Sequence, residues 1–138
     1  MELEVFVLCD AATDSQGKLN ILGAFDTILA PSLPAVHPQC AMVARVRFST
    51  SEGGEHSFKL TLNEGSGKSL LPPFEVKAQV HFEQPDKPSR LNIIVSVGGL
   101  KLESYGLHTA LLEIDGAAIA TSPFLVSKPI GSVGAAAH

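Results

Sequence analysis

The stretch FEVKAQVHF, residues 74–82, shows most directly what kind of fold this chain adopts. Its even positions, from Phe74 and Val76 to Phe82, are apolar, and its odd positions are polar or charged. Successive side chains of a β-strand point to opposite faces of the sheet. The alternation therefore predicts a strand with one face in the core, including Phe74 and Val76, and one face in water.

The same alternation recurs over residues 40–50, 56–63 and 91–97. Ile94 breaks it in the last of these runs, which favours apolar cover on both faces of that strand. Residues 3–9 begin with alternating acids and then become apolar on both faces, as a more central strand does. Helical periodicity is essentially absent, so the chain is predicted to be built from strands.

Turn signals separate these runs. Asp115-Gly116 favours a type I′ turn and predicts a hairpin between residues 107–114 and 117–120. Gly23 predicts a bend or bulge between short runs at 19–22 and 25–29, and Pro123 predicts an edge strand or a break before residues 124–126. Turns every ten residues or so are typical of a sandwich, so we expect an all-β, antiparallel two-layer β-sandwich, immunoglobulin-like or jelly-roll-like, with about 7–9 strands.

Composition narrows the class of protein. The 138 residues are 45% hydrophobic and 17% charged, which predicts one domain over residues 1–130 with a flexible tail at 131–138. No apolar run reaches the about 18 residues of a membrane span, and the acidic start does not resemble a signal peptide. With a net charge of -4 and scattered Lys and Arg, we expect a cytoplasmic protein that binds neither nucleic acid nor membrane.

Catalytic motifs are not found. Gly65-Ser66-Gly67-Lys68-Ser69 ends like a phosphate-binding loop, but the position that needs the first glycine is Leu62 and a strand follows, so a hairpin loop explains it better. The five histidines and many serines show no spacing that selects a nucleophile and its base. The sequence therefore assigns no catalytic residue and no cofactor, and favours a protein that is not an enzyme.

A metal site has four candidate ligands if it exists: Cys9, Asp10, His37 and Cys40. His37 precedes Cys40 by three residues, and Cys9-Asp10 would join them if the first strand lay beside this loop. Zinc needs about four such ligands in a tetrahedral array. The competing interpretation is a proline-shaped loop with a capping histidine and buried thiols, and no metal is assigned.

The stretch LCDAATDSQGKLNILGAFDTILAPSLPAVHPQC, residues 8–40, resembles the opening signature of a family of short uncharacterised bacterial β-sandwich proteins. ARVRF at 44–48, Tyr105-Gly106, IDG at 114–116 and Ser122-Pro123 are similar to later parts of that family. The resemblance covers nearly the whole chain. It implies a bacterial origin, a stand-alone β-sandwich and no known catalytic residues to transfer.

Two functions follow as hypotheses. The first is a non-catalytic interaction or assembly module whose sheet edges or loops meet another protein or a second copy of the chain. The alternative is a small-ligand or metal-binding protein, or an enzyme, with its site at the loops around Asp10, His37 and Cys40.

Overall fold

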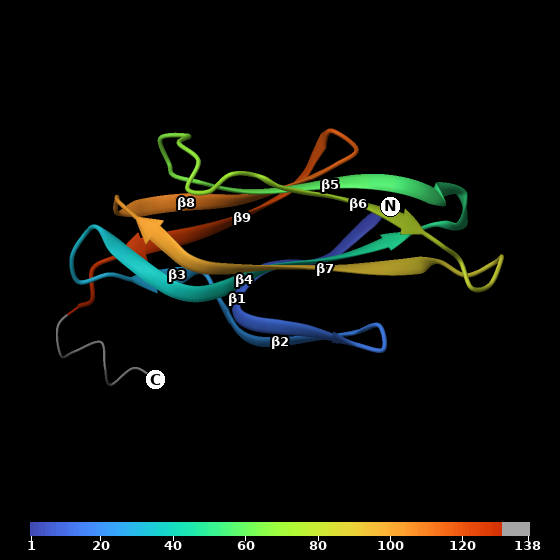
Figure 1. Ribbon diagram of the computed structural model, residues 1–138, viewed down its shortest axis with the longest axis horizontal. Coiled ribbons are helices and arrows are strands. Elements are labelled where there is room, and N and C mark those ends of the chain that lie inside the picture. Colours follow the sequence, from blue (N-terminus) through green and yellow to red (C-terminus); the bar gives the residue numbers. More distant parts are fainter. Residues whose placement is uncertain (131–138) are drawn as a thin grey trace.

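The computed structural model describes residues 1–130, so the predicted tail at 131–138 lies outside the described part (Figure 1). The only helix in that part is one turn of 3-10 helix, η1 (Thr50–Glu52), and it is neither long nor apolar enough to cross a membrane. The strands are β1 (Glu2–Ser15), β2 (Lys18–Phe25), β3 (Thr27–Leu29), β4 (Ala35–Phe48), β5 (Gly54–Asn63), β6 (Phe74–Val80), β7 (Ser89–Leu102), β8 (Gly106–Ile114) and β9 (Ala117–Ser127).

These strands form two sheets that face each other (Figure 1). One has the order β2-β1-β4-β7 and the other β3-β9-β8-β5-β6. All neighbours are antiparallel except β3 and β9, which run parallel. The predicted all-β sandwich is confirmed. Its core is made by the apolar faces of both sheets, and its largest fully buried side chains are Phe48, Phe58, Phe124, Leu60, Leu62, Leu100, Leu102, Leu112 and Ile114.

The strand order is that of an immunoglobulin-like sandwich rather than a jelly roll. β4 and β7 pair in one sheet, and β5, β8 and β9 are consecutive in the other, as strands B, E and C, F, G are in immunoglobulin domains. Constant-type domains add a strand D beside strand E. Here the chain passes from β6 directly into β7, so within residues 1–130 no strand pairs with the other side of β7.

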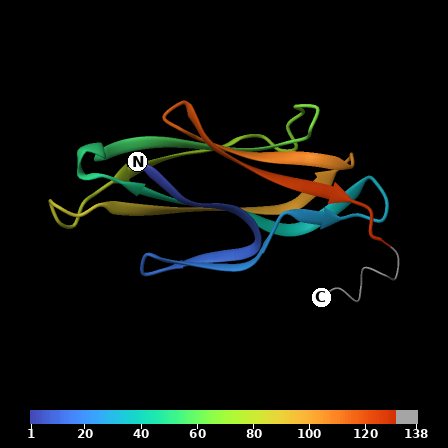
Figure 2. The ribbon, with the colours of Figure 1, turned by 180° about the vertical axis from the view of Figure 1, so that it is seen from behind.

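β1 makes a U-turn that the sequence did not reveal. Its first part pairs with β4 as far as Cys9, and its second part pairs with β2 in a hairpin. The tip of this hairpin lies back over the outer face of the β4 sheet, where the Asn92 Nδ2 donates to Asp14 Oδ2 at 2.9 Å and the Arg45 Nη1 donates to the Gly17 carbonyl at 3.1 Å. Figure 2 shows the reversal and the hairpin as a third layer.

The hairpin covers a second, smaller apolar cluster on the outer face of that sheet. Cys9, Ala41 and Val43 are buried in it, and Val7, Ala12, Leu19 and Ile94 pack against them. β4 is consequently buried on both faces from Cys40 to Ala44. The cover predicted from Ile94 is confirmed, and it comes from the N-terminal hairpin.

The three predicted turn or break positions have different outcomes. Asp115 and Gly116 have φ of 52° and 82°, which confirms the type I′ hairpin. At Pro123 the strand does not break, since β9 runs through it, but Pro123 precedes the residues of β9 that pair with β3 and so lies where β9 is the edge of its sheet within residues 1–130. At Gly23 a bend or bulge was predicted; the residue has a φ of +67° within β2 without a shift of register, and the interruption between β2 and β3 falls at Asp26.

β6 is less buried than the alternation of residues 74–82 predicted. Phe74 and Val76 point toward the other sheet, as Leu60 and Phe58 do directly opposite them on β5, but they remain 42% and 36% exposed. β6 is an edge strand, and the four-stranded sheet ends at β7. The side chains therefore face a place that no strand of the described chain covers.

His56 connects η1 to the β8–β9 turn. Its Nδ1 lies 2.6 Å from Asp115 Oδ2 and its Nε2 lies 2.6 Å from the Glu52 carbonyl oxygen. Both partners only accept hydrogen bonds, so this geometry requires the doubly protonated imidazolium. The hydrogen bond with Asp115 is the largest cause that raises the pKa of His56, and the same bond lowers the pKa of Asp115.

We predict that this link makes stability depend on pH. A raised His56 pKa stabilises the fold fully below the unfolded value of about 6.5, and this stabilisation is lost as pH rises through the folded pKa. The lowered pKa of Asp115 acts only at acid pH, as pH falls below about 3.9. Between pH 5.5 and 8.5, urea unfolding should show a loss about 1 kcal/mol larger in the native chain than in His56→Gln, a figure limited by solvent screening of the exposed Asp115. Parallel losses in both proteins would contradict the link.

Candidate functional site

The structure separates the two cysteines proposed as metal ligands. Cys9 lies in the outer cluster under the N-terminal hairpin, whereas Cys40 lies in the main core. Both thiols are free and buried. Burial raises the pKa of Cys40 to about 11 and is the main cause that raises the pKa of Cys9. Both side chains are therefore protonated at neutral pH, which suits packing rather than ligation or nucleophilic attack.

Asp10 and His37, in contrast, line one shallow groove, together with residues 23–29, which comprise the end of β2, Asp26 and β3. The His37 ring packs on Phe25 with a centroid distance of 5.7 Å, and its buried Nε2 has no hydrogen-bond partner. Asp26 Oδ1 accepts a hydrogen bond from the Thr27 hydroxyl at 3.2 Å. Neither Asp10 nor Asp26 forms an ion pair within the described residues. The groove thus combines two carboxylates with two aromatic rings.

This set of side chains suits an organic cation better than a metal ion. Carboxylates attract a cation and aromatic faces add to that attraction. A metal needs several ligands converging on one point, and in residues 1–130 no group of three or more His, Cys, Asp and Glu side chains is placed to hold one. Of the four predicted ligands, the structure brings only Asp10 and His37 to a common surface.

The carboxylate of Asp10 occupies the space that a side chain at Gly23 would fill. A Cβ on Gly23 would lie 2.3 Å from Asp10 Oδ2, and Gly23 has φ of +67°, a conformation that costs other residues about 1 to 2 kcal/mol. The absent side chain therefore leaves room for the carboxylate on the rim of the groove. This contact links two residues of the signature segment across the β1–β2 hairpin.

Gly23→Ala should consequently destabilise the protein by about 2 kcal/mol, from backbone strain and from displacement of the Asp10 carboxylate. The double variant Asp10→Ala, Gly23→Ala removes the steric part and should recover about half of the loss. Urea unfolding of the two single variants and the double variant measures the coupling. Strictly additive effects would mean that the two side chains do not compete for the same space.

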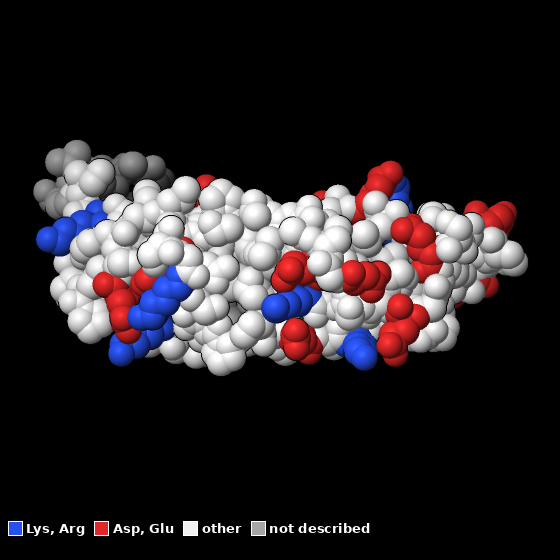
Figure 3. All heavy atoms as spheres, turned by 90° about the horizontal axis from the view of Figure 1, so that it is seen from above, with Lys and Arg blue, Asp and Glu red and all other residues white. Residues whose placement is uncertain are grey.

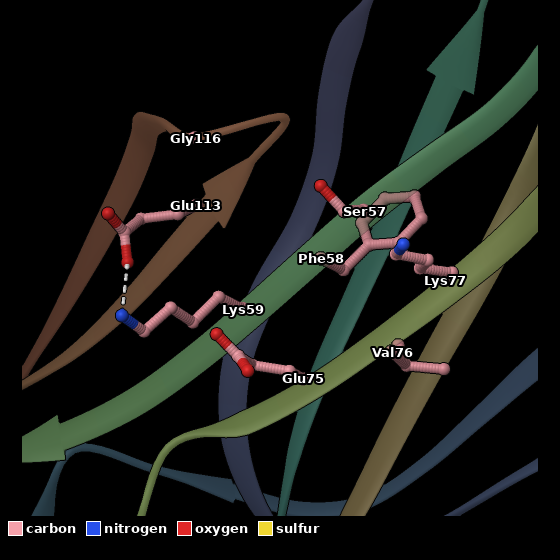
Figure 4. A pocket seen from close by; sticks show the side chains of 8 residues that line it. All are labelled: Ser57, Phe58, Lys59, Glu75, Val76, Lys77, Glu113 and Gly116. Atoms are coloured by element: carbon pink, nitrogen blue, oxygen red, sulfur yellow. Dashed lines mark ion pairs between the residues drawn. The ribbon is translucent and has the colours of Figure 1, made fainter.

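The outer face of the five-stranded sheet carries charges that pair with each other. Lys59 on β5 lies directly opposite Glu113 on β8 and Glu75 on β6. Figure 4 shows this lysine reaching Glu113, at 3.9 Å, above a hollow whose wall includes Glu75 and Lys77. Such cross-strand pairs stabilise a sheet by their mutual attraction. The hollow is therefore explained without a ligand.

The rest of that face is uncharged. Leu107 and Leu125 lie directly opposite each other on β8 and β9 and are 59% and 40% exposed, and Leu29 on β3 is 60% exposed. Figure 3 looks onto this face and shows a broad white area between groups of charged side chains. Exposed leucines of this kind make the area a second surface to consider for contacts between proteins.

The free edge of β7 is the most distinctive feature of the molecule. β7 has 14 residues and pairs with β4 along its length, while its other side pairs with no strand of residues 1–130. In such a strand about half of the N–H and C=O groups point away from the sheet. Residues 91–100 contain no charge, and the strand ends carry Arg90 and Lys101.

An apolar crevice runs beside the middle of this edge. It has a volume of about 260 Å³ and lies between the two sheets. Val95 to Gly98 form its β7 side, and Phe74 with Leu71 and Pro72 forms the opposite side. Its floor is made of core side chains, Met42, Leu60 and Leu62. The crevice is large enough for one bulky apolar side chain.

Sequence reasoning predicted the strand at 91–97 but not its free edge or the crevice. Strand order decides which strand lies at an edge, and alternation carries no information on strand order. The only signal was the run of uncharged residues from Leu91 to Leu100, which is long for an edge that no charge protects.

Comparison with known proteins agrees with the resemblance seen in the sequence. The model of a family of unknown function (DUF6941) matches residues 4–127. The chain belongs to this family. The match runs from within β1 to the last residue of β9, so the family segment includes the N-terminal hairpin, the groove and the free edge of β7. A search of curated proteins finds no match.

Proposed function

We propose that this member of the family is a non-catalytic interaction module that binds an extended segment of a partner along the free edge of β7. The observation that carries the proposal is that, within residues 1–130, this 14-residue strand has a hydrogen-bonded neighbour on one side only. A strand edge presents main-chain donors and acceptors at the spacing of another strand, so an added strand is the ligand that matches it.

The composition of β7 supports this proposal. Long, uncharged edge strands promote aggregation, and proteins usually protect them with charges, proline or a covering element. Residues 91–100 contain no charged residue and no proline, and only Gly98 and Gly99 interrupt their strand-forming pattern. An edge of this kind is useful when a partner covers it.

The histidines support a non-catalytic role. His56 is the one histidine in residues 1–130 that contacts a carboxylate, and its second ring nitrogen is occupied by the Glu52 carbonyl. It therefore has no free nitrogen to activate a nucleophile. His108 is buried in the core with its Nδ1 at 3.0 Å from the Gly106 carbonyl oxygen, so substrate does not reach it.

Binding of a small cation in the groove of Asp10, Asp26 and His37 is the second candidate function. It is favoured by the two carboxylates that form no ion pair within residues 1–130 and by the buried Nε2 of His37, which has no hydrogen-bond partner in that part of the chain. Native mass spectrometry of protein purified without chelator distinguishes the candidates. A stoichiometric added mass that disappears in Asp10→Asn would support the groove, and protein without added mass would argue against it.

The proposed function predicts a specific pattern of amide hydrogen exchange. In the isolated protein, protection should alternate along β7, because only every second N–H points to β4, whereas β4 should be protected at consecutive residues from Ala41 to Arg47. A panel of strand-forming synthetic peptides should contain members that slow exchange at the unprotected β7 amides by about tenfold or more. The β4 amides serve as the internal control.

Two results would overturn the proposal. One is uniform protection of β7 in dilute protein, since the edge would then be covered within the chain itself. The other is a panel in which no peptide protects β7, although the peptides include both charged and apolar examples.

A further inference from the structure

We infer that the segment bound at β7 is about ten to twelve residues long, with one bulky apolar side chain near its middle and acidic residues at both ends. This inference rests on the proposed function and specifies the chemistry of its partner. It follows from the crevice, the two exposed apolar side chains of β6, and the charges that flank the edge.

The crevice specifies the central side chain. A strand that pairs with β7 points every second side chain toward the five-stranded sheet. Val95 to Gly98, which form one side of the crevice, lie near the midpoint between Arg90 and Lys101. The side chain that enters the crevice therefore belongs near the middle of the segment, and a Leu, Met or Phe would meet mostly apolar residues, with Ser96 the one polar residue of the lining.

The position of β6 explains why a strand is needed there. Phe74 of β6 lies across the crevice from Val95 to Gly98, above the floor made by Met42, Leu60 and Leu62. A strand added beside β7 would close the open side of this crevice next to β6, where Phe74 and Val76 point inward but are 42% and 36% exposed. An added strand would cover both side chains, which are too exposed for a core and too apolar for a free surface.

The charges specify the ends. Arg90 and Lys101 are the only charged residues of β7, and both are cationic. They are eleven positions apart, which corresponds to about 36 Å of extended chain. Acidic residues at both ends of a segment of that length would lie beside these cations. Arg90 contacts Glu4 of β1, on the far side of β4 from the free edge, so an acid at that end of the segment would compete with Glu4 for Arg90. Lys101 contacts Glu103 and its side chain remains 63% exposed, so it can accept a second acid.

A second copy of the chain fits this edge less well. The inward side chains of its β7, such as Ile93 and Val95, are already buried in its own core and cannot enter the crevice. Antiparallel pairing of two β7 strands about their midpoints would also place Arg90 of each copy opposite Lys101 of the other, and like charges directly opposite each other destabilise a sheet. The occupant is therefore a segment free of its own fold.

The test uses fluorescent synthetic peptides of about twelve residues, with Glu at both ends, Leu in the middle, and Thr, Ser and Gln elsewhere. Fluorescence anisotropy should show that central Leu→Asp weakens binding by about 30-fold, because the crevice is apolar. Exchange of both terminal Glu for Lys should weaken it by about fivefold at low salt, and less at high salt. Methylation of the amide nitrogens on one edge of the peptide should abolish binding.

A protein variant tests the same site from the other side. Phe74 lines the crevice, is 42% exposed and lies outside the main core cluster, so Phe74→Asp should fold and place a carboxylate in the crevice. It should weaken binding of the Leu peptide by tenfold or more. Leu107→Asp makes the same chemical change at an exposed residue on the outer face of β8 and should leave binding unchanged. Equal melting temperatures of the variants and the native chain establish that both fold.

The outcomes separate the two proposals. If no peptide binds and β7 stays unprotected in hydrogen exchange, the proposed function itself fails. If peptides protect β7 but the peptide with a central Asp, or the one with terminal Lys residues, binds as tightly as the Leu peptide, then edge pairing holds and the inferred partner chemistry is wrong. A dimer in sedimentation that Phe74→Asp dissociates would replace the peptide with a second copy of the chain.

Discussion

Burial of β4 on both of its faces is the constraint on which the rest of the structure depends. Consecutive buried residues from Cys40 to Ala44 require apolar cover above and below the sheet. The five-stranded sheet supplies the cover on one face. On the other face it is supplied by β1, which pairs with β4 and then reverses so that Ala12 and Leu19 pack over Val43. The N-terminal hairpin is thus part of the core structure.

The same arrangement determines where the molecule is incomplete. Because β1 and β2 lie on the other side of β4 in the strand order and fold back over its outer face, neither lies beside β7, and within residues 1–130 that sheet ends at β7 while the opposite sheet continues to β6. The free edge, the crevice and the exposed Phe74 and Val76 are therefore three consequences of one mismatch between the sheets. The groove at Asp10 and His37 has a different origin, the crossing from β2 to β3 at Asp26.

Local patterns in the sequence predicted local structure well. The Asp115-Gly116 turn and the alternating strands are confirmed because strand periodicity and turn chemistry depend on neighbouring residues. Burial of Phe74 was predicted wrongly, because it depends on which strand lies across from β6. The U-turn after Asp10 was missed since β1 stays in one strand through it. The sequence also did not indicate that Cys9 and Cys40 face opposite sides of one sheet, because that depends on which strands pair and in which register.

The central claim is that a partner segment adds to the sheet beside β7. The most direct measurement is isotope-filtered NMR on labelled protein with the unlabelled Leu peptide, which detects contacts between the two molecules. We expect cross-strand contacts from the peptide backbone to residues 91–100 and contacts from the central Leu to Phe74 and Leu62. Contacts to Leu107 and Leu125 on the outer face of the other sheet, or to the groove at Asp10, with none to β7, would contradict the claim.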